Sequence, residues 1–460
     1  MSHGQKAKTA ETRGESEIVT ALLAWYRANA RKLPWRKTTD PYAIWISEIM
    51  LQQTQVKTVM PYWERWMRDL PTLEAFAAAR TSRVLKLWEG LGYYSRARNA
   101  HLAAKFILKN HAGFFPTTRE GLLALPGIGR YTAGAICSIA FDQPAPVLDG
   151  NVIRVLTRLY AIHSDPRNRP TNERLWHLAE TLVETANATR VNGERPCAEL
   201  NQALMELGAV ICTTVAPQCD RCPVQNRCIA FRKRCVERLP FRSKKSPATA
   251  RHFVGVVLEH RGCYLVRKRP ADVVNANLWE FPNMEAGLNR SSRSSRGNEA
   301  HLSKLLQSLT TEVSGETNRK LPSAGIYGKA PAPFCTIKHT ITRYRITLNV
   351  FRANVDIAPD PTTVPLNQLS KPYAAINSTM AKAASLSPRE RAGVRGNATS
   401  NLQPASSRPR QIIAGSAKEG KWCTLTQLQK LPFSSAHKQI LQKLVEARRN
   451  RGNDILTNRI

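Results

Sequence analysis

Four cysteines within seventeen residues are the most distinctive chemical feature of the sequence. Cys212, Cys219, Cys222 and Cys228 follow the pattern C-x6-C-x2-C-x5-C. Four thiolates that converge on one centre suit a [4Fe-4S] cluster, which takes four soft ligands. A tetrahedral zinc ion also accepts four cysteines, although zinc sites usually pair short C-x2-C knuckles across a longer gap. We therefore predict an iron–sulfur loop over residues 212–228 and keep zinc as the alternative.

A single acidic residue lies in an otherwise apolar helical segment. Glu48 belongs to the stretch WISEIMLQQTQV and has apolar residues on both sides of it. Apolar surroundings raise the pKa of a carboxyl group, which can then hold a proton for general acid catalysis. A partly buried structural glutamate is the alternative. The sequence thus offers Glu48 as a candidate acid.

A glycine-containing turn and a second acidic residue follow along the chain. In LPGIGRYTAG, Gly127 and Gly129 permit a tight turn whose backbone N–H groups face an anion such as a DNA phosphate. A plain helical hairpin has the same pattern. In VLDGNV, Asp149 and Asn151 stand where the next helix begins, a position that also favours an ordinary N-cap.

Two regions of different periodicity must position these residues. Residues 18–235 place apolar side chains at helical spacing, which predicts an all-α domain. Residues 1–17 are polar, and we expect a disordered basic N-terminus there. Residues 236–250 are basic, contain prolines and lack periodicity, as expected for an interdomain linker.

The pattern changes to strands after the linker. HFVGVVLEHRGCYLVRKR predicts a β-hairpin that turns at Arg261 and Gly262, and HTITRYRITLNVFRANV alternates like a further strand. These signals predict an α+β domain over residues 251–445. Residues 287–300 and 377–420 are rich in Ser, Arg, Pro and Gly, and we expect both to be disordered insertions.

The charge of the chain points to its partner. The 460 residues carry a formal net charge of +34 at pH 7, which favours nucleic acid. The sequence has no apolar run long enough to span a bilayer, so we expect no membrane partner. The first residues lack the apolar core of a secretory signal. We therefore expect a protein that is not secreted and works in the cytoplasm, at the nucleoid of a bacterial-type cell.

Taken together, these residues resemble the helix-hairpin-helix DNA glycosylase superfamily and, within it, the MutY family of adenine DNA glycosylases. The resemblance covers nearly all of residues 18–235. Its motifs are PWR (34–36), SEIMLQQTQV (47–56), LWEGLGYYSRARN (87–99), LPGIGRYTAGAI (125–136), VLDGNVIRVL (147–156), LNQALMELGAVIC (200–212) and the cysteine loop. It implies a two-lobed helical fold with a [4Fe-4S] loop and a cleft that grips double-stranded DNA.

The resemblance also implies roles for individual residues. Glu48 would protonate the adenine of an adenine:8-oxoguanine or adenine:guanine mispair, while an ionised Asp149 would stabilise the sugar cation. Asn151 and Tyr131 would orient these two carboxyl groups by hydrogen bonds. The residues that would contact the extruded base or the DNA are Arg36, Leu51, Gln53, Thr54, Tyr93, Gly127, Gly129 and Gln202. Among them, Gln53 and Tyr93 match family residues that wedge into the duplex.

One position separates two activities. The related endonuclease III enzymes carry a nucleophilic lysine directly after the Gly-Arg of the hairpin, where this chain has Tyr131. A phenol cannot form the Schiff base that lyase chemistry needs, so the resemblance implies a monofunctional glycosylase. A bifunctional lyase and a non-catalytic iron–sulfur DNA-binding protein remain the alternatives.

The C-terminal region resembles the Nudix-like domain found in the same family, and HFVGVVLEHRGCYLVRKRP with ANLWEFPN carries this resemblance. The Glu-rich run by which a Nudix hydrolase holds Mg²⁺ does not follow, so recognition of 8-oxoguanine is expected instead of hydrolysis. The loop that reads this base in the family aligns with residues 341–343. There Thr342 keeps a hydroxyl, but the aromatic and imidazole side chains of many relatives are missing. The family commonly works as a monomer, which we expect here.

Overall fold

The computed structural model describes residues 3–243, 247–271, 273–286, 305, 332–341, 343–354 and 420–457. Two compact units divide the chain. The first contains Met1–Leu87 and Arg96–Ser246, and the second contains Trp88–Ser95 and Pro247–Ile460. Of the two predicted insertions, 287–300 lies outside the described residues, as does 377–420 up to its last residue. No described helix combines the length and apolar character that crossing a bilayer requires.

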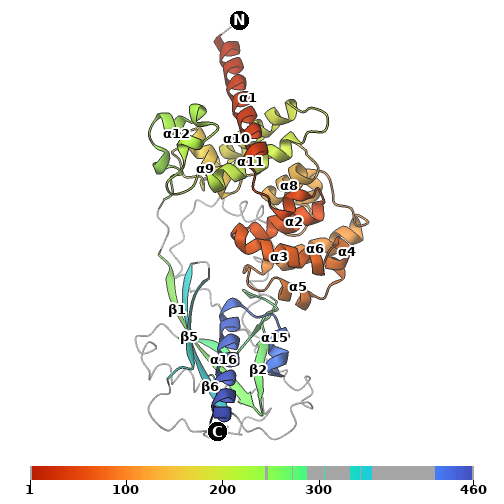
Figure 1. Cartoon of the computed structure of the whole chain (residues 1–460), viewed down its shortest axis with the longest axis vertical. Coiled ribbons are helices and arrows are strands. Elements are labelled where there is room, and N and C mark those ends of the chain that lie inside the picture. The colour runs from red at the N-terminus through yellow and green to blue at the C-terminus, as the bar shows by residue number, and fades with distance from the viewer. Residues whose placement is uncertain are drawn as a thin grey trace, which may run out of the picture. The chain divides into compact units, whose positions relative to one another are not determined.

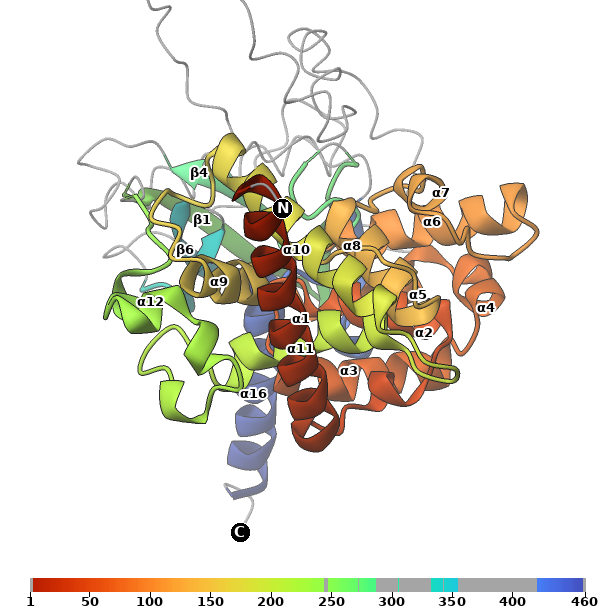
Figure 2. The same cartoon turned by 90° about the horizontal axis from the view of Figure 1, so that it is seen from above.

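The first unit consists of helices (Figure 1). They are α1 (His3–Asn29), η1 (Pro34–Lys37), α2 (Pro41–Leu51), α3 (Val56–Asp69), α4 (Leu73–Ala78), α5 (Thr81–Leu87), α6 (Ser95–Asn110), α7 (Arg119–Leu123), α8 (Arg130–Ala135), the π-helical turn η2 (Ile136–Ala140), α9 (Gly150–Leu159), α10 (Arg169–Ala188), α11 (Pro196–Val210), η3 (Cys219–Arg221), η4 (Gln225–Arg227), α12 (Ile229–Arg232) and η5 (Val236–Arg238). Helix α1 runs beside α10 and α11 (Figure 2).

The N-terminus differs from the prediction. Disorder was expected over residues 1–17, whereas α1 begins at His3. Residues 5–17 contain many Ala, Lys, Gln and Glu residues, which favour a helix. They also continue directly into the amphipathic part of α1, so each added residue forms a hydrogen bond without a new helix nucleus.

Helices α2 and α9 carry the two candidate carboxyl groups, and an aspartate begins each of them. The side chain of Asp40 accepts hydrogen bonds from the backbone N–H groups of Tyr42 and Ala43, with Pro41 at the first helical position. Every residue of α2 from Tyr42 to Met50 is buried. At α9 the N-cap is Asp149 itself, so the candidate carboxylate also begins the helix.

The turn between α7 and α8 needs glycine at one of its two positions. Gly127 has a φ of +76°, and a Cβ placed there would lie 2.5 Å from Cβ of Asn99. Gly129 has an ordinary φ of −101° as the N-cap of α8. A Cβ at Gly129 would meet nothing within 4 Å, so its glycine is not required by the fold itself.

The second unit is built on a mixed sheet. The described strands and helices are β1 (Thr249–His260), β2 (Cys263–Lys268), β3 (Trp279–Glu280), β4 (Asn283–Ala286), β5 (Cys335–Ile341), β6 (Tyr344–Asn354), β7 (Gly420–Thr424), α15 (Leu425–Lys430) and α16 (Ser435–Thr457). The sheet order is β3-β2-β1-β6-β5, with β4 paired to β1 and β7 to β2. β1 and β6 run parallel, the other pairs run antiparallel, and α16 packs on β5.

The predicted hairpin is confirmed. β1 and β2 pair His260 with Cys263, which leaves Arg261 and Gly262 as a two-residue loop. Both loop residues have positive φ, 46° and 77°, as expected for the tight turn that matches strand twist.

The start of the predicted linker is instead part of the helical unit. Residues Val236–Arg238 form η5, and the backbone carbonyls of Val236 and Leu239 accept hydrogen bonds from Nε of Arg158. Ser243 binds the carboxylate of Asp165 through its backbone N–H and its hydroxyl. Basic and proline residues indicated a linker, but these long-range bonds hold the segment against the helices.

Candidate active site and cysteine centre

Glu48 and Tyr131 meet through a short hydrogen bond. Glu48 lies on α2 and is 4% exposed, and the hydroxyl of Tyr131, from α8, donates to its Oε2 at 2.5 Å. Burial raises the pKa of Glu48 to about 7, and the negative charge of Asp149 adds to this, while Tyr131 and Arg36 act in the opposite direction. At neutral pH this carboxyl group therefore gives and takes a proton readily.

Asp149 is held by three hydrogen bonds. Its Oδ1 accepts from the backbone N–H groups of Asn151 at 2.9 Å and Val152 at 2.8 Å, and its Oδ2 accepts from Nδ2 of Asn151 at 2.9 Å. Burial raises the pKa of Asp149, and these hydrogen bonds limit the rise because they favour the ionised form. The negative charge of Asp149 also raises the pKa of both Glu48 and Tyr131, so the three groups lie close enough to influence one another's ionisation.

An ion cluster adjoins this site. Glu206 on α11 is 1% exposed; Arg31 binds it at 2.6 and 2.8 Å and Arg36 at 2.8 Å. Burial favours the protonated form of Glu206, but the two arginines outweigh it and lower its pKa to about 2. Arg36 is thus paired with Glu206 while its charge also reaches Glu48.

A buried arginine connects α9 to the start of the cysteine loop. The guanidinium of Arg154 donates to Oδ1 of Asn151 at 2.8 Å, to the carbonyl of Gly208 at 2.6 Å and to the carbonyl of Cys212 at 2.7 Å. Asn151 is therefore fixed on one side by Arg154 while its other amide atom holds Asp149.

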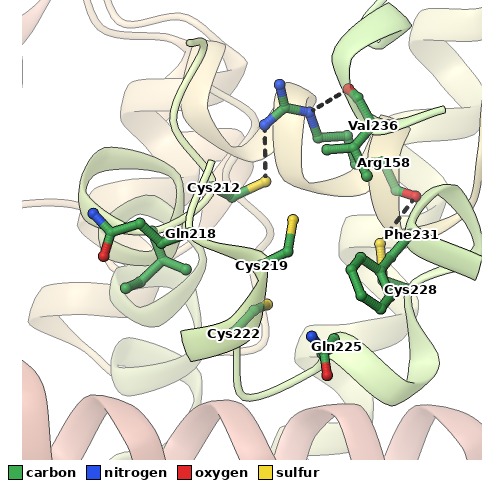
Figure 3. A pocket seen from close by; sticks show the side chains of 10 residues that line it. Arg158, Cys212, Gln218, Cys219, Cys222, Gln225, Cys228, Phe231 and Val236 are labelled. Carbon is green, nitrogen blue, oxygen red and sulfur yellow. Dashed lines mark hydrogen bonds between the residues drawn. The ribbon is translucent and has the colours of Figure 1, made fainter. Parts of the chain in front are cut away.

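The four predicted cysteines line one pocket (Figure 3). Nη1 of Arg158 donates to Sγ of Cys212 at 3.3 Å, and Sγ of Cys228 donates to the carbonyl of Arg158 at 3.5 Å. Burial raises the pKa of Cys222 to about 12, so burial favours the protonated thiol at neutral pH. Among the residues that the structure describes, no group of three or more His, Cys, Asp or Glu side chains is arranged to hold a single metal ion.

The predicted DNA-contacting residues lie in several places. Leu51 ends α2, and Gln53 follows it, exposed and with a positive φ of 59°. Thr54 closes this turn through its backbone N–H on the carbonyl of Leu51. Gln202 lies on α11, one turn before Glu206. Thr342 is outside the described residues.

The backbone of Tyr93 also lies in the left-handed region, with a φ of 46°, and the residue is 49% exposed. Both residues predicted to wedge into DNA, Gln53 and Tyr93, thus adopt a backbone conformation that residues other than glycine rarely take. Such conformations concentrate at functional sites, where surrounding contacts hold them in place.

Several residues of these sites were missed by the sequence analysis. They are Arg31, Arg96, Arg154, Arg158 and Glu206. Arg154, Arg158 and Glu206 carried the same signal that singled out Glu48, a charge within an apolar helical stretch. Arg96 was recognisable only in the structure, where it donates to the carbonyls of Ile49 and Met50 in α2 and to that of Gln52, the residue directly after the helix.

Comparison with known proteins defines first the class and then the family. The sequence profile of the HhH-GPD superfamily of base excision DNA repair proteins matches residues 46–181. The adenine DNA glycosylase of Mus musculus is 34% identical over 450 residues, which span 85% of this chain and 82% of the mouse protein. The chain therefore belongs to the adenine DNA glycosylase family, and it removes adenine from DNA in base excision repair.

Other relatives align over shorter stretches. The adenine DNA glycosylases of Homo sapiens and Arabidopsis thaliana are 38% and 40% identical over 57% and 58% of this chain, and the alignments span 57% and 47% of those proteins. Among solved structures, a thermostable thymine-DNA glycosylase is 29% identical with a TM-score of 0.43, over 49% of this chain and 99% of its own.

Proposed function

We propose that this adenine DNA glycosylase acts on adenine opposite 8-oxoguanine or guanine and hydrolyses the N-glycosidic bond without cutting the strand. The observation that carries the proposal is the pairing of Glu48, with its pKa near 7, and the hydrogen-bonded Asp149 in one site. Two carboxyl groups in different environments suit a reaction in which one supplies a proton and the other stabilises a cation.

The reaction begins when the adenine leaves the base stack, at a cost of about a few kcal/mol. Glu48 protonates N7 of the adenine, so the base departs as a neutral molecule with the electrons of the C1′–N9 bond. Asp149 stabilises the cationic sugar that remains. Glu48, now ionised, takes the proton of the water that adds to C1′, which restores its starting state.

Tyr131 and Asn151 act as orienting groups in this scheme. Tyr131 fixes the carboxyl group of Glu48, and Asn151 fixes that of Asp149. Tyr131 cannot attack the sugar as a lysine amine does, so no Schiff base forms and the product is an intact strand with an abasic site.

The remaining contacts grip the DNA and the extruded base. Gln53 and Tyr93 enter the duplex, and their positive φ angles support a role that needs a fixed presentation. Arg36, Leu51, Thr54 and Gln202 face the base. The N–H groups at Gly127 and Gly129 receive a DNA phosphate, and the open space above Gly129 supports this contact.

The cysteine pocket holds a [4Fe-4S] cluster in our proposal. The four thiols line one common pocket, with Cys219 and Cys222 both at the turn η3. A shared space of this kind suits a cube of four irons better than one zinc ion that draws its sulfurs to about 2.3 Å. The cluster supplies structural cross-linking of this loop. Arg158 donates to one of its ligands, Cys212. An absorbance band in the visible and iron analysis distinguish it from zinc.

The second unit, in our proposal, is a Nudix-like domain that recognises 8-oxoguanine in the opposite strand. Its mixed sheet, with β1 parallel to β6 and α16 against β5, supports this assignment. We also propose that the protein works as a monomer, as the family commonly does.

One experiment separates the three candidate activities. Duplexes that carry adenine opposite 8-oxoguanine, or opposite guanine, are incubated with the protein, and each sample is divided and treated with or without hot alkali. Strand breaks only after alkali support monofunctional excision. Breaks without alkali identify a lyase, and intact DNA in both halves identifies a binding protein. Glu48→Gln is expected to bind these duplexes and release no adenine.

A further inference from the structure

Tyr93 lies in the loop Trp88–Ser95, which belongs to the second unit. The chain directly before this loop, up to Leu87, and directly after it, from Arg96, belongs to the first unit. The loop is tightly folded, since Gly90, Gly92 and Tyr93 all have positive φ angles of 112°, 69° and 46°. Nε1 of Trp88 closes the loop by donating to the carbonyl of Gly92 at 3.0 Å. The side chain of Tyr93 remains 49% exposed at its tip.

Glu89 and Tyr94, which lie before and after Tyr93, bind the backbone N–H and the backbone carbonyl of one residue, Phe433. Glu89 Oε1 accepts the backbone N–H of Phe433 at 2.9 Å. The hydroxyl of Tyr94 donates to the carbonyl of the same Phe433 at 3.0 Å. Glu89 and Tyr94 are only 6% and 2% exposed, so water does not compete for either bond.

Phe433 belongs to the hydrophobic core of the second unit. Its side chain is fully buried and stacks on Phe281, with ring centroids 5.8 Å apart. It lies two residues before α16, and Lys438 of that helix forms an ion pair with Glu89 at 3.0 Å. The loop is thus anchored to the core of the unit rather than to its surface.

We propose that Glu89 and Tyr94 are positioning residues that hold the Tyr93 loop on Phe433 and so present Tyr93 to the duplex in one orientation. The inference rests on the proposed entry of Tyr93 into the DNA. A tyrosine in the left-handed region is strained and keeps this conformation only where neighbouring contacts impose it. The same unit that we assign to reading the opposite base therefore also carries the wedge, so binding of that base and unstacking of the mispair are mechanically linked.

The test uses the full chain and a duplex with 2-aminopurine beside the adenine, whose fluorescence rises on unstacking. Tyr94→Phe removes only the hydroxyl, and we expect the rates of unstacking and excision to fall about three- to tenfold. Tyr42→Phe is the matched control, because that buried hydroxyl likewise donates to a backbone carbonyl, of Leu70 at 2.8 Å, and accepts an N–H group. The control is expected to unstack the mispair like the parent.

Glu89 provides a second, independent variant. Glu89→Gln keeps an acceptor for the N–H of Phe433 and is expected to retain most of the unstacking rate, whereas Glu89→Ala is expected to lose it. Circular dichroism and thermal unfolding confirm that each variant is folded. Equal loss in both variants contradicts a positioning role for this hydrogen bond.

A double-mutant cycle shows whether the effect passes through Tyr93. In a Tyr93→Ala background, Tyr94→Phe is expected to cause no further loss, because the side chain to be positioned is gone. The same fold loss in both backgrounds overturns the proposal. If Tyr93→Ala unstacks the mispair like the parent, the wedge and its positioning are both overturned, while continued release of adenine leaves the proposed excision reaction intact.

Discussion

The hydroxyl of Tyr131 lies 2.5 Å from Oε2 of Glu48 and donates a hydrogen bond to it. This bond favours the ionised carboxylate, while burial, the larger effect, favours the protonated form, and the resulting pKa is about 7. A proton donor is most effective when its pKa lies near the working pH. The pair therefore sets the proton affinity of the proposed general acid.

Tyr131→Phe is predicted to move the pH dependence of excision to higher pH. Removing the donor withdraws an interaction that lowers the pKa of Glu48, so the carboxyl group stays protonated at higher pH than in the parent. Because orientation is also lost, the maximal rate is expected to fall about tenfold. Single-turnover adenine release between pH 5 and 9 measures both effects. An alkaline limb at the same pH in both proteins contradicts the assignment of Glu48 as the acid.

Glu48→Gln is predicted to stabilise the folded protein at alkaline pH although it abolishes excision. The pKa of Glu48 rises from 4.5 to about 7 on folding, so the folded state binds the proton more tightly. The parent therefore loses stability as the pH rises through 7, by about 3 kcal/mol at most. Glutamine has no proton to lose. Urea unfolding at pH 8 is expected to show the gain, which shrinks towards zero at pH 5.

The four cysteines and Glu48 could be singled out as candidates from the sequence because their local context was informative. Four cysteines at close spacing and an acid within an apolar helix are visible without any knowledge of tertiary contacts, and the four cysteines do line one pocket. The hairpin at Arg261 and Gly262 was predictable for the same reason, since a two-residue turn is decided locally.

Long-range contacts decided what the sequence could not show. Glu206 meets Arg31 across 175 positions of the chain, and Arg158 holds Leu239 across 81 positions, inside what looked like a linker. The loop Trp88–Ser95 carries a helical-domain motif but joins the second unit through Phe433. No local pattern encodes such partners.

Glu206→Gln is predicted to destabilise the protein at neutral pH by about 2 kcal/mol, since it leaves Arg31 and Arg36 without their buried counter-charge. The pKa of Glu206 falls from 4.5 to about 2 on folding. Its contribution is therefore present above pH 4.5 and is lost as the pH falls towards 2. Urea unfolding at pH 7 and pH 3 measures the difference between parent and variant at each pH.

The surface ion pair of Arg27 with Glu199, at 2.8 Å, is the matched control. Both members are partly exposed, so Glu199→Gln is expected to cost no more than about 0.5 kcal/mol. Equal costs for the two substitutions contradict the special role of the buried cluster.

Gly208→Ala is predicted to impair excision by displacing Asn151. A Cβ at position 208 on α11 would lie 2.6 Å from Cβ of Asn151 and 3.0 Å from its Cα, which is closer than real side chains approach. The first turn of α9 must then move, and Asn151 with it, so the amide that holds Asp149 loses its position. We expect at least about a tenfold slower excision and a stability loss of about 1–3 kcal/mol.

Gly150→Ala makes the prediction decisive. Alanine favours a helix over glycine by up to about 1 kcal/mol, so propensity alone predicts that both substitutions stabilise the protein. At Gly150 a Cβ meets nothing within 4 Å, and stability is expected to be kept or to rise. A loss at 208 with none at 150, measured by urea unfolding, isolates the close approach of α11 to Asn151 as the cause. A Gly208→Ala protein that is more stable than the parent and excises adenine at the parental rate contradicts it.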